Sequence, residues 1–256
     1  MNKNKTVVRS MDILNLFIDH TELSFHEIIK LSEIPKTSVY RMLKTLEEIG
    51  FIKKGADDNY RLDMLFLKFG HLVSNRLDVR KIAYSIMQGI HKDFKEAVIL
   101  AIRDGKEAIY VEIINEKQKV RINTAIGHKS PLYVGACPRA IFSFLPEYEI
   151  NVFLESVELE SYAEGTITDM EKLFKRIKQE SQQGFSISHS ELENHISAVA
   201  APIYNHLGEV VAAMGIAGFE ANYQGGNIDI FVGELLKATI EISRQLGYEQ
   251  PERKSL

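Results

Sequence analysis

Apolar side chains in the first fifty residues recur at the spacing of amphipathic helices. Residues 7–18 (VVRSMDILNLFI) show this period and predict a first helix. Ser24 and Glu27 have the spacing of a capping box ahead of an apolar run, which predicts the start of a second helix. A third helix is predicted to have Pro35 in its first turn and to end near Gly50, a residue that readily adopts a left-handed conformation.

The stretch that follows the third helix predicts a β-hairpin. Residues 51–62 (FIKKGADDNYRL) contain two short β-prone pieces around a turn at residues 55–59. Three helices followed by a hairpin form the pattern of a winged helix-turn-helix domain, which we place at residues 1–62. Residues 63–76 lack a Pro-, Ser- or Gly-rich run, so we expect a linker helix there.

The remaining residues, 77–256, predict a second domain in which helices alternate with strand pairs. The expected helices cover residues 78–94, 138–145, 166–184 and 229–246, and the expected strands form hairpins at 97–114 and 197–218 with a further strand at 119–126. Short turns at Asp104-Gly105 and Asn205–Gly208 make these pairs antiparallel. The fold class is therefore α+β, with a mainly antiparallel sheet.

The third helix has one apolar stripe and one basic face. Val39, Met42, Leu43 and Leu46 fall on the stripe, and the first carboxylate of the helix is Glu47. Cations, hydroxyls and an aromatic ring on the other face are groups that contact phosphates and base edges in a major groove. We expect DNA contacts from Lys36, Thr37, Ser38, Tyr40, Arg41 and Lys44, and from Lys53 and Lys54 in the hairpin.

The distribution of charge agrees with a local rather than a general attraction to DNA. The net charge is -4, but residues 1–62 carry 10 Lys/Arg against 9 Asp/Glu. A solvated basic face without a ligand is the plain alternative for the third helix. Because helix-turn-helix folds also serve as protein-interaction modules, a winged helix that docks another protein beside a degenerate sensor domain is the alternative function.

Composition indicates an ordinary globular protein, with 45% apolar and 26% charged residues. The single cysteine, Cys137, excludes an intrachain disulfide. No apolar run is long enough for a transmembrane helix, and the N-terminus lacks the features of a signal peptide. We expect a cytoplasmic protein.

The sequence predicts no enzyme, metal site or cofactor. Cys137 precedes a predicted helix and could be a reactive thiolate, although a lone cysteine in an apolar segment is more often a packed residue. His128, His189 and His195 do not have metal-ligand spacing with it. Residues 188–195 (SHSELENH) resemble a polar surface loop, and no catalytic triad order or phosphate-binding glycine loop is present.

The order of several segments resembles the IclR family of bacterial transcriptional regulators. In the first domain these are VVRSMDILNLF, LSFHEIIKLSEIPKTSVYRMLKTLEEIGFI and YRLDMLFLKFG; in the second they include DGKEAIYVEII, IGHKSPLYVGACPRAIFSFLPE and AVAAPIYNHLGEVVAAMGIAG. The resemblance covers about residues 7–247. It implies a DNA-binding winged helix, a linker helix and a GAF/PAS-like effector-binding domain over residues 77–256. It also implies a homodimer, and in some members a tetramer, on a near-palindromic double-stranded operator. Members of the family repress or activate nearby operons, and we expect a repressor here.

The resemblance further implies where a small organic effector of unknown identity would bind. The implied positions are Ile126, Leu132, Tyr133, Ala136, Cys137, Ser188, Ile196, Ala198, Gly215 and Ala217. Free N–H groups near the start of helix 138–145 would suit a carboxylate. Members that bind carboxylates commonly place an acid, a cysteine and two serines where this chain has Ser188, Ala198, Gly215 and Ala217, so we expect a larger or more apolar effector here, with an empty or collapsed pocket as the alternative.

Overall fold

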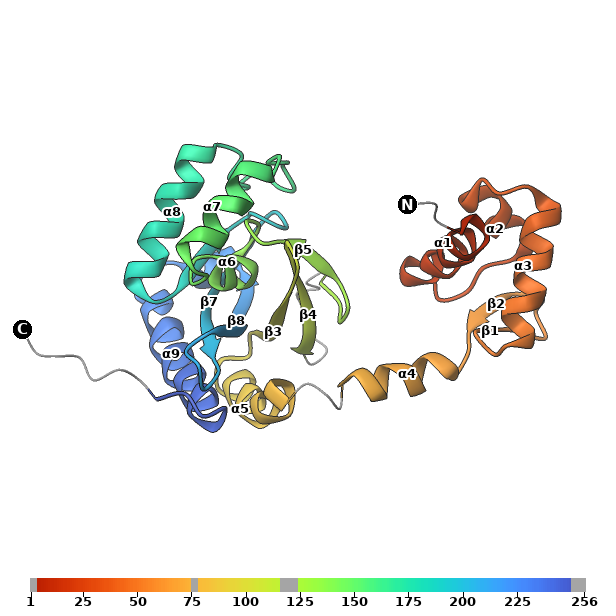
Figure 1. Cartoon of the computed structure of the whole chain (residues 1–256). Helices are drawn as coiled ribbons and strands as arrows, with labels where there is room; N and C mark the ends of the chain where they lie inside the picture. Colours follow the sequence, from red (N-terminus) through yellow and green to blue (C-terminus); the bar gives the residue numbers. More distant parts are fainter. Residues whose placement is uncertain (1–3, 75–77, 116–123, 250–256) are drawn as a thin grey trace, which may run out of the picture. The chain divides into compact units, whose positions relative to one another are not determined.

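The chain forms two compact units, Met1–Arg76 and Leu77–Leu256. The computed structural model describes residues 4–74, 78–115 and 124–249 (Figure 1). The first unit is built from helices and a two-stranded hairpin. The second is built on a six-stranded sheet.

The first unit has the predicted winged helix-turn-helix fold. Its elements are α1 (Lys5–Asp19), α2 (Phe25–Ser32), α3 (Lys36–Glu48), β1 (Ile52–Lys54), β2 (Tyr60–Leu62) and α4 (Leu65–Ser74). The capping box is present, because the Ser24 hydroxyl accepts from the Glu27 N–H while the Glu27 carboxylate accepts from the Ser24 N–H. Pro35 lies one position earlier than expected, as the residue that caps α3, and Gly50 has the left-handed φ of 77° predicted for the helix end.

One hydrophobic core holds the first unit together. It joins Ile13 and Phe17 of α1 to Ile28 of α2, Leu43 of α3 and Ile52 of the hairpin. The buried residues of α3 lie on its predicted apolar stripe, so burial fixes which face of α3 points outward.

The second unit is built around an antiparallel sheet with the strand order β5-β4-β3-β8-β7-β6. Its elements are α5 (Asp78–Phe94), β3 (Ala97–Asp104), β4 (Glu107–Ile114), β5 (Lys129–Pro131), α6 (Ala136–Phe142), α7 (Glu147–Ser156), α8 (Met170–Gln183), β6 (Ser186–His189), β7 (Ile196–Tyr204), β8 (Val210–Phe219), the 3-10 helix η1 (Glu220–Tyr223) and α9 (Asn227–Gln245). The central pair joins β3 to β8, with Ala97 opposite Ala217.

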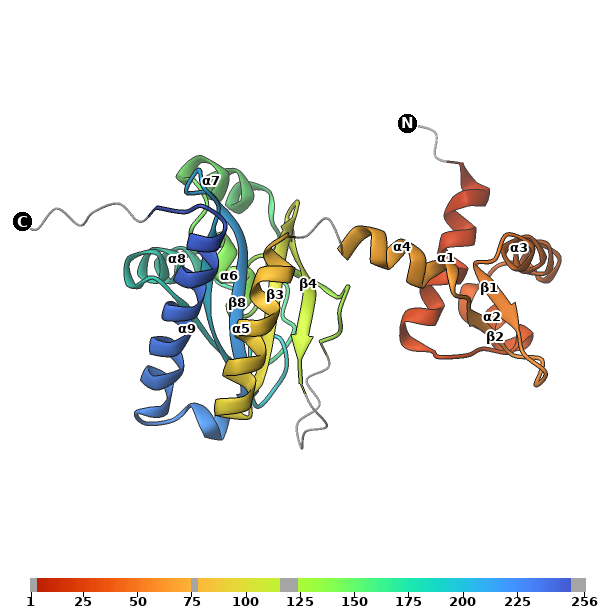
Figure 2. The same ribbon diagram turned by 90° about the horizontal axis from the view of Figure 1, so that it is seen from below.

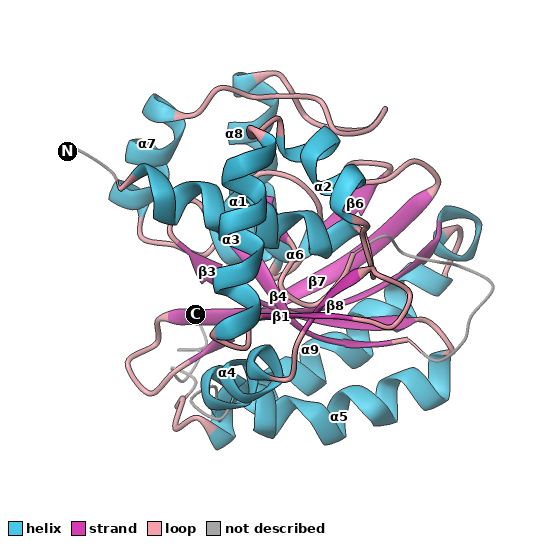
Figure 3. Cartoon of the chain, turned by 90° about the vertical axis from the view of Figure 1, so that its right-hand side faces the viewer, coloured by secondary structure: helices cyan, strands magenta, loops and turns pink. Residues whose placement is uncertain are grey.

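Helices cover both faces of this sheet. α5 and α9 lie side by side against one face (Figure 2). The opposite face carries α6, α7 and α8 (Figure 3). Because side chains alternate along each strand, two cores result: Leu100 and Met214 pack toward α5 and α9, while Ala101 and Ala213 pack toward α6.

The structure corrects three details of the sequence prediction. The helix expected at 138–145 is α6, which begins at Ala136, so Ala136 and Cys137 belong to its first turn. The helix α7 and the strand β5 were not predicted. The expected strand at 119–126 falls mostly on residues 119–123, which lie outside the described residues, and residues 124–126 are not a strand. None of the described helices is long and apolar enough to cross a membrane.

Candidate functional site

The outward face of α3 is exposed and carries most of the predicted DNA-contacting residues. Lys36, Thr37, Tyr40, Arg41 and Lys44 are exposed, and Tyr40 keeps 59% of its surface accessible. Opposite this face Val39, Leu43 and Leu46 are buried and anchor the helix, while Met42 of the same stripe is only half-buried. The arrangement presents three cations along a helix that is fixed from behind, as recognition of DNA in a groove requires.

Two of the residues predicted to contact DNA, Ser38 and Lys44, are not fully exposed and unpaired. Ser38 is half-buried, on the side of α3 that turns toward α1. The Lys44 ammonium lies 4.0 Å from the Glu48 carboxylate one turn later, a distance at the limit of an ion pair. Both side chains of that pair are largely exposed, so the contact is weak and Lys44 stays accessible to a phosphate.

The hairpin is less basic than its sequence indicates. Lys53 is exposed, but the Lys54 ammonium lies 2.7 Å from the Asp58 carboxylate and 5.8 Å from the centre of the Tyr60 ring. The hydrogen bond with Asp58 raises the pKa of Lys54. Arg61 binds the Asp57 carboxylate in the same turn. The carboxylates of Asp57 and Asp58 at the tip of the hairpin therefore offset the positive charges of Arg61 and Lys54.

The second unit encloses a cavity of about 50 Å³ between the sheet and α6. Its lining consists of Ile99, Tyr110, Thr124, Gly135, Ala136, Cys137, Ser188, Leu192, Glu193, Ile196, Ala198 and Ala217. Six of the predicted effector residues meet here, namely Ala136, Cys137, Ser188, Ile196, Ala198 and Ala217.

The other four predicted effector residues do not line this cavity. Ile126 is 59% exposed on the surface, while Leu132 and Tyr133 are buried in the core beside α6. Gly215 lies behind Cys137, where a Cβ atom would stand 2.5 Å from the cysteine Sγ. Gly215 therefore makes room for the cysteine instead of facing the cavity.

Sequence reasoning missed six of the lining residues, which come from different parts of the chain. Ile99 and Tyr110 come from β3 and β4, whose central residues are buried on both faces, so periodicity along these strands does not show which side chains face the cavity. Thr124, Gly135, Leu192 and Glu193 come from loops and helix ends, whose position depends on the tertiary fold and leaves no local signal.

Two titratable groups of the cavity, Cys137 and Tyr110, are held in uncharged form. Burial raises the pKa of the Cys137 thiol to about 12 and also raises that of the Tyr110 hydroxyl, which lies 3.5 Å from the Ser130 Oγ. Both groups therefore act near neutral pH as hydrogen-bonding groups in an apolar surface. A thiol with so high a pKa carries very little thiolate near neutral pH, which argues against a reactive role for Cys137.

A wider and more polar cleft of about 290 Å³ adjoins the cavity. The two share Thr124, Leu192 and Glu193, and the cleft adds His128 and Tyr162. Because the shared residues belong to both spaces, a molecule seated in the cleft would reach the apolar interior by passing these side chains.

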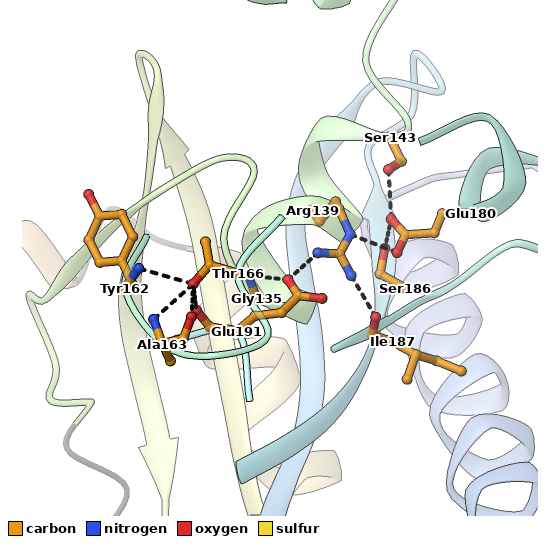
Figure 4. Close-up of polar contacts among 10 residues, drawn as sticks. All are labelled: Gly135, Arg139, Ser143, Tyr162, Ala163, Thr166, Glu180, Ser186, Ile187 and Glu191. Carbon is orange, nitrogen blue, oxygen red and sulfur yellow. Dashed lines mark hydrogen bonds and ion pairs between the residues drawn. The ribbon is translucent and has the colours of Figure 1, made fainter. Parts of the chain in front are cut away.

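Behind the cavity lies the buried guanidinium of Arg139 in α6. Its Nε donates to the Glu180 carboxylate at 2.7 Å, and its two other nitrogens donate to the Glu191 carboxylate and the Ile187 carbonyl (Figure 4). Burial acts to lower the pKa of Arg139, but the carboxyl groups of Glu180 and Glu191 raise it above its ordinary value. Arg139 therefore remains charged inside the protein.

This ion pair reaches the cavity wall through Glu191. The Glu191 carboxylate also accepts a hydrogen bond of 3.1 Å from the N–H of Gly135, which lines the cavity. Thr166 donates to the Glu191 carbonyl at 2.6 Å, and the next two residues, Leu192 and Glu193, line both spaces. The position of this wall is thus fixed by a buried charge network (Figure 4).

The prediction of a polar surface loop at residues 188–195 is therefore wrong for Glu191, which is 5% exposed, and for Ser188 and His189, which belong to β6. Arg139, the partner of Glu191, lies 52 positions earlier, so no local pattern could show the contact.

The residues considered as metal ligands are not brought together. Cys137 is buried, and His189 forms a hydrogen bond of 2.8 Å with the Ser197 Oγ. Within residues 4–74, 78–115 and 124–249, no group of three or more His, Cys, Asp or Glu side chains is placed to hold a metal ion.

Comparison with known proteins gives matches along nearly the whole chain. Residues 6–55 match the IclR helix-turn-helix domain, and residues 71–244 match the bacterial transcriptional regulator IclR C-terminal domain. The HTH-type transcriptional regulator KipR of Bacillus subtilis is 49% identical over 247 residues, which cover 96% of this chain and 99% of KipR.

Solved structures agree with this assignment. The crystal structure of the Thermotoga maritima IclR is 29% identical, covers 95% of this chain and 99% of its own, and superposes with a TM-score of 0.82. An IclR homologue from Microbacterium hydrocarbonoxydans, solved with 4-hydroxybenzoate, shares the fold at 20% identity and a TM-score of 0.82, covering 94% of this chain and 99% of its own. The chain belongs to the IclR family of DNA-binding transcriptional regulators.

Proposed function

We propose that this regulator is a repressor whose affinity for a near-palindromic operator is controlled by a small organic effector in the second unit. The observation that carries the proposal is the apolar cavity beside α6, which opens into a polar cleft and has a wall set by a buried ion pair. A homologue of the same fold was solved with 4-hydroxybenzoate, which supports the choice of a small organic molecule as effector. The proposal includes no catalytic activity, and it places the protein in the cytoplasm with its DNA.

The size of the cavity indicates how an effector would act. About 50 Å³ is far less than the roughly 300–1,000 Å³ of typical small-molecule pockets. An effector would therefore have to displace side chains such as Leu192 as it enters. Displacement of this wall would strain the contacts of Glu191 with Gly135 and Arg139, so occupancy would change the packing of α6.

Such coupling needs little free energy. A difference of about 1–3 kcal/mol in effector affinity between two arrangements of the regulator changes operator affinity about 5–150-fold. The effector must bind one arrangement better than the other, because a ligand with equal affinity for both does not change the equilibrium between them.

We also propose that the protein acts as a homodimer through α4. This helix is rich in apolar residues, and Leu67, Phe69 and Leu72 are exposed in the isolated chain although Phe66 packs on Phe51. A helix that is apolar on nearly all sides requires a partner surface. A second copy fits because a two-fold dimer would present two copies of α3 to two halves of a palindrome.

The DNA part of the proposal is tested by fluorescence anisotropy with a pool of random duplexes at two salt concentrations, followed by sequencing of the bound fraction. We expect salt-sensitive binding that enriches a near-palindrome, and we expect Arg41→Ala to weaken it. A well-folded protein that enriches no sequence would contradict operator recognition and favour a protein-interaction module.

The effector part is tested with the enriched duplex and a panel of small organic compounds that includes 4-hydroxybenzoate. We expect at least one compound to change operator affinity in the wild type and to lose its effect in Ala198→Leu, which fills the cavity. Ala221→Leu, at an exposed position of η1, is the matched control. An active compound whose effect survives Ala198→Leu would place the effector elsewhere.

A further inference from the structure

A groove separates the N-terminal half of α1 from α3 in the first unit. It is lined by Lys5, Thr6, Arg9, Ser10, Ser38, Arg41, Met42 and Thr45 and has a volume of about 280 Å³. The lining thus combines three cations with four hydroxyl groups and contains no carboxylate. Neither Lys5 nor Arg9 belongs to the face that the sequence predicts to contact DNA.

The three cations of the groove are free to bind an external anion. Lys5 and Arg9 lie one turn apart on α1, so their side chains share one face, and Arg41 approaches from α3. Within the described part of the first unit none of the three has an ion-pair partner, whereas Lys54 and Arg61 of the hairpin do.

Two of the four hydroxyl groups of the groove already have hydrogen-bond acceptors within the protein. Ser10 donates its hydroxyl proton to the Thr6 carbonyl at 3.0 Å, and Thr45 donates to the Arg41 carbonyl at 3.1 Å. Both protons are therefore used within their own helices. The cationic side chains remain the main donors that can serve a ligand in the groove.

We propose that this groove holds a backbone phosphate of the DNA that α3 reads, with Lys5 and Arg9 of α1 completing a clamp with Arg41. The proposal rests on DNA binding by α3. Guanidinium and ammonium groups on two sides of one phosphate are the usual chemistry of such contacts. Because the cations are exposed and screened by salt, a free phosphate ion would be held only weakly, whereas a phosphate of a duplex is also positioned by the rest of the interface.

The proposal separates two roles on α3. Arg41 and Ser38 line the groove and face the DNA backbone, so they position the helix. Lys36, Tyr40 and Lys44 form the neighbouring row and remain available for base edges. Arg41 should therefore contribute to affinity on every sequence, and the outer row to the choice among sequences.

The test measures binding of the full chain to the enriched duplex and to an unselected duplex across a range of salt concentrations. We expect Lys5→Ala and Arg9→Ala each to weaken both complexes and to reduce the slope of log K against log salt by up to about 0.9 for each phosphate that the variant no longer neutralises. Arg9→Lys should keep most of the slope. Lys172→Ala, an exposed cation on α8 of the other unit, is the charge-matched control and should behave as the wild type.

Ethylation of individual phosphates then locates the clamp on the DNA. We expect one or more phosphates in each half-site whose ethylation weakens the wild type but no longer affects Arg9→Ala. The clamp would be overturned if Lys5→Ala and Arg9→Ala both kept the wild-type affinity and salt slope while Arg41→Ala remained defective. That result would leave DNA binding by α3 intact. An equal loss of affinity in Lys172→Ala would also overturn the clamp, and a wild type without salt-sensitive binding would remove the premise that α3 binds DNA.

Discussion

Arg139 and Glu180, 41 residues apart in the sequence, meet in the interior of the second unit through a hydrogen bond of 2.7 Å between Nε and Oε1. Both side chains are fully buried. Ser143 and Ser186 donate to the other oxygen of Glu180 at 2.9 and 2.8 Å, so this carboxylate ties α6 and β6 to α8.

Removal of one partner of this pair should destabilise the second unit strongly. We expect Arg139→Met to lower the free energy of unfolding by about 3–5 kcal/mol, because it leaves two carboxyl groups buried without their cation. Urea denaturation measures the change. Lys175→Met, which removes an exposed ion pair with Glu171 on the same helix α8, should have little effect. Equal small losses of stability in both variants would show that the buried pair adds no stability.

Asp58→Asn should strengthen DNA binding. The substitution removes the counter-charge of Lys54 and one negative charge from the hairpin tip. Asparagine tolerates the left-handed conformation of this position, whose φ is 64°. Anisotropy with the enriched duplex should show tighter binding and a steeper salt dependence than the wild type. Unchanged binding would mean that the hairpin stays away from the DNA.

Leu67→Glu should dissociate the proposed dimer. The side chain is 66% exposed within the chain, so the monomer fold should tolerate the charge while a symmetric apolar interface would not. Sedimentation velocity should give a monomer for the variant and a dimer for the wild type. Lys68→Gln, at the adjacent exposed position, changes the net charge by the same one unit and is the control. A wild-type monomer would remove the basis for the dimer.

The Cys137 thiol should react slowly with a disulfide reagent in the native protein. Its pKa of about 12 leaves very little thiolate, and its surface is 5% exposed. Labelling with dithionitrobenzoate in mildly alkaline buffer should be slow before denaturation and rapid and stoichiometric in urea. Rapid labelling of the folded protein would show that the cavity opens freely.

Glu96→Gln should stabilise the protein near neutral pH. Burial raises the pKa of Glu96, and the hydrogen bond from Asn222 offsets part of that effect. A carboxyl group with a raised pKa contributes stability that is fully present below its unfolded pKa of about 4.3 and is lost as the pH rises through the folded value. The advantage of the variant should therefore be greatest at neutral pH and fade in acid, as unfolding at several pH values would show. A pH-independent difference would indicate that charge is not the cause.

The sequence was sufficient for elements with a clear period or a specific end signal. The stripe on α3 and the capping box of Ser24 and Glu27 are local patterns, and the structure confirms both. The helix α7 was missed because only Phe153 of its ten residues is buried, which leaves almost no amphipathic signal. The strand β5 has three residues and is too short for a period.

The proposed effector site was only partly predictable for a different reason. Strand positions such as Ala198 and Ala217 came from the resemblance to the IclR family, and they reach the cavity. The wall formed by Leu192 and Glu193 depends on a buried ion pair between distant segments. Because the energy of such a pair comes from three-dimensional packing, no short sequence pattern reports it.

The pairing of β3 with β8 also sets an order of events during synthesis. The two central strands of the sheet pair residues 97–102 with residues 212–217. The ribosome must therefore synthesise most of the chain before the sheet of the second unit can form. The first unit needs only residues before 77 and can fold while the rest is being made. The first unit can therefore be folded before the second unit is complete. A nascent chain that stops between β3 and β8 would contain the DNA-binding unit without a folded second unit to control it.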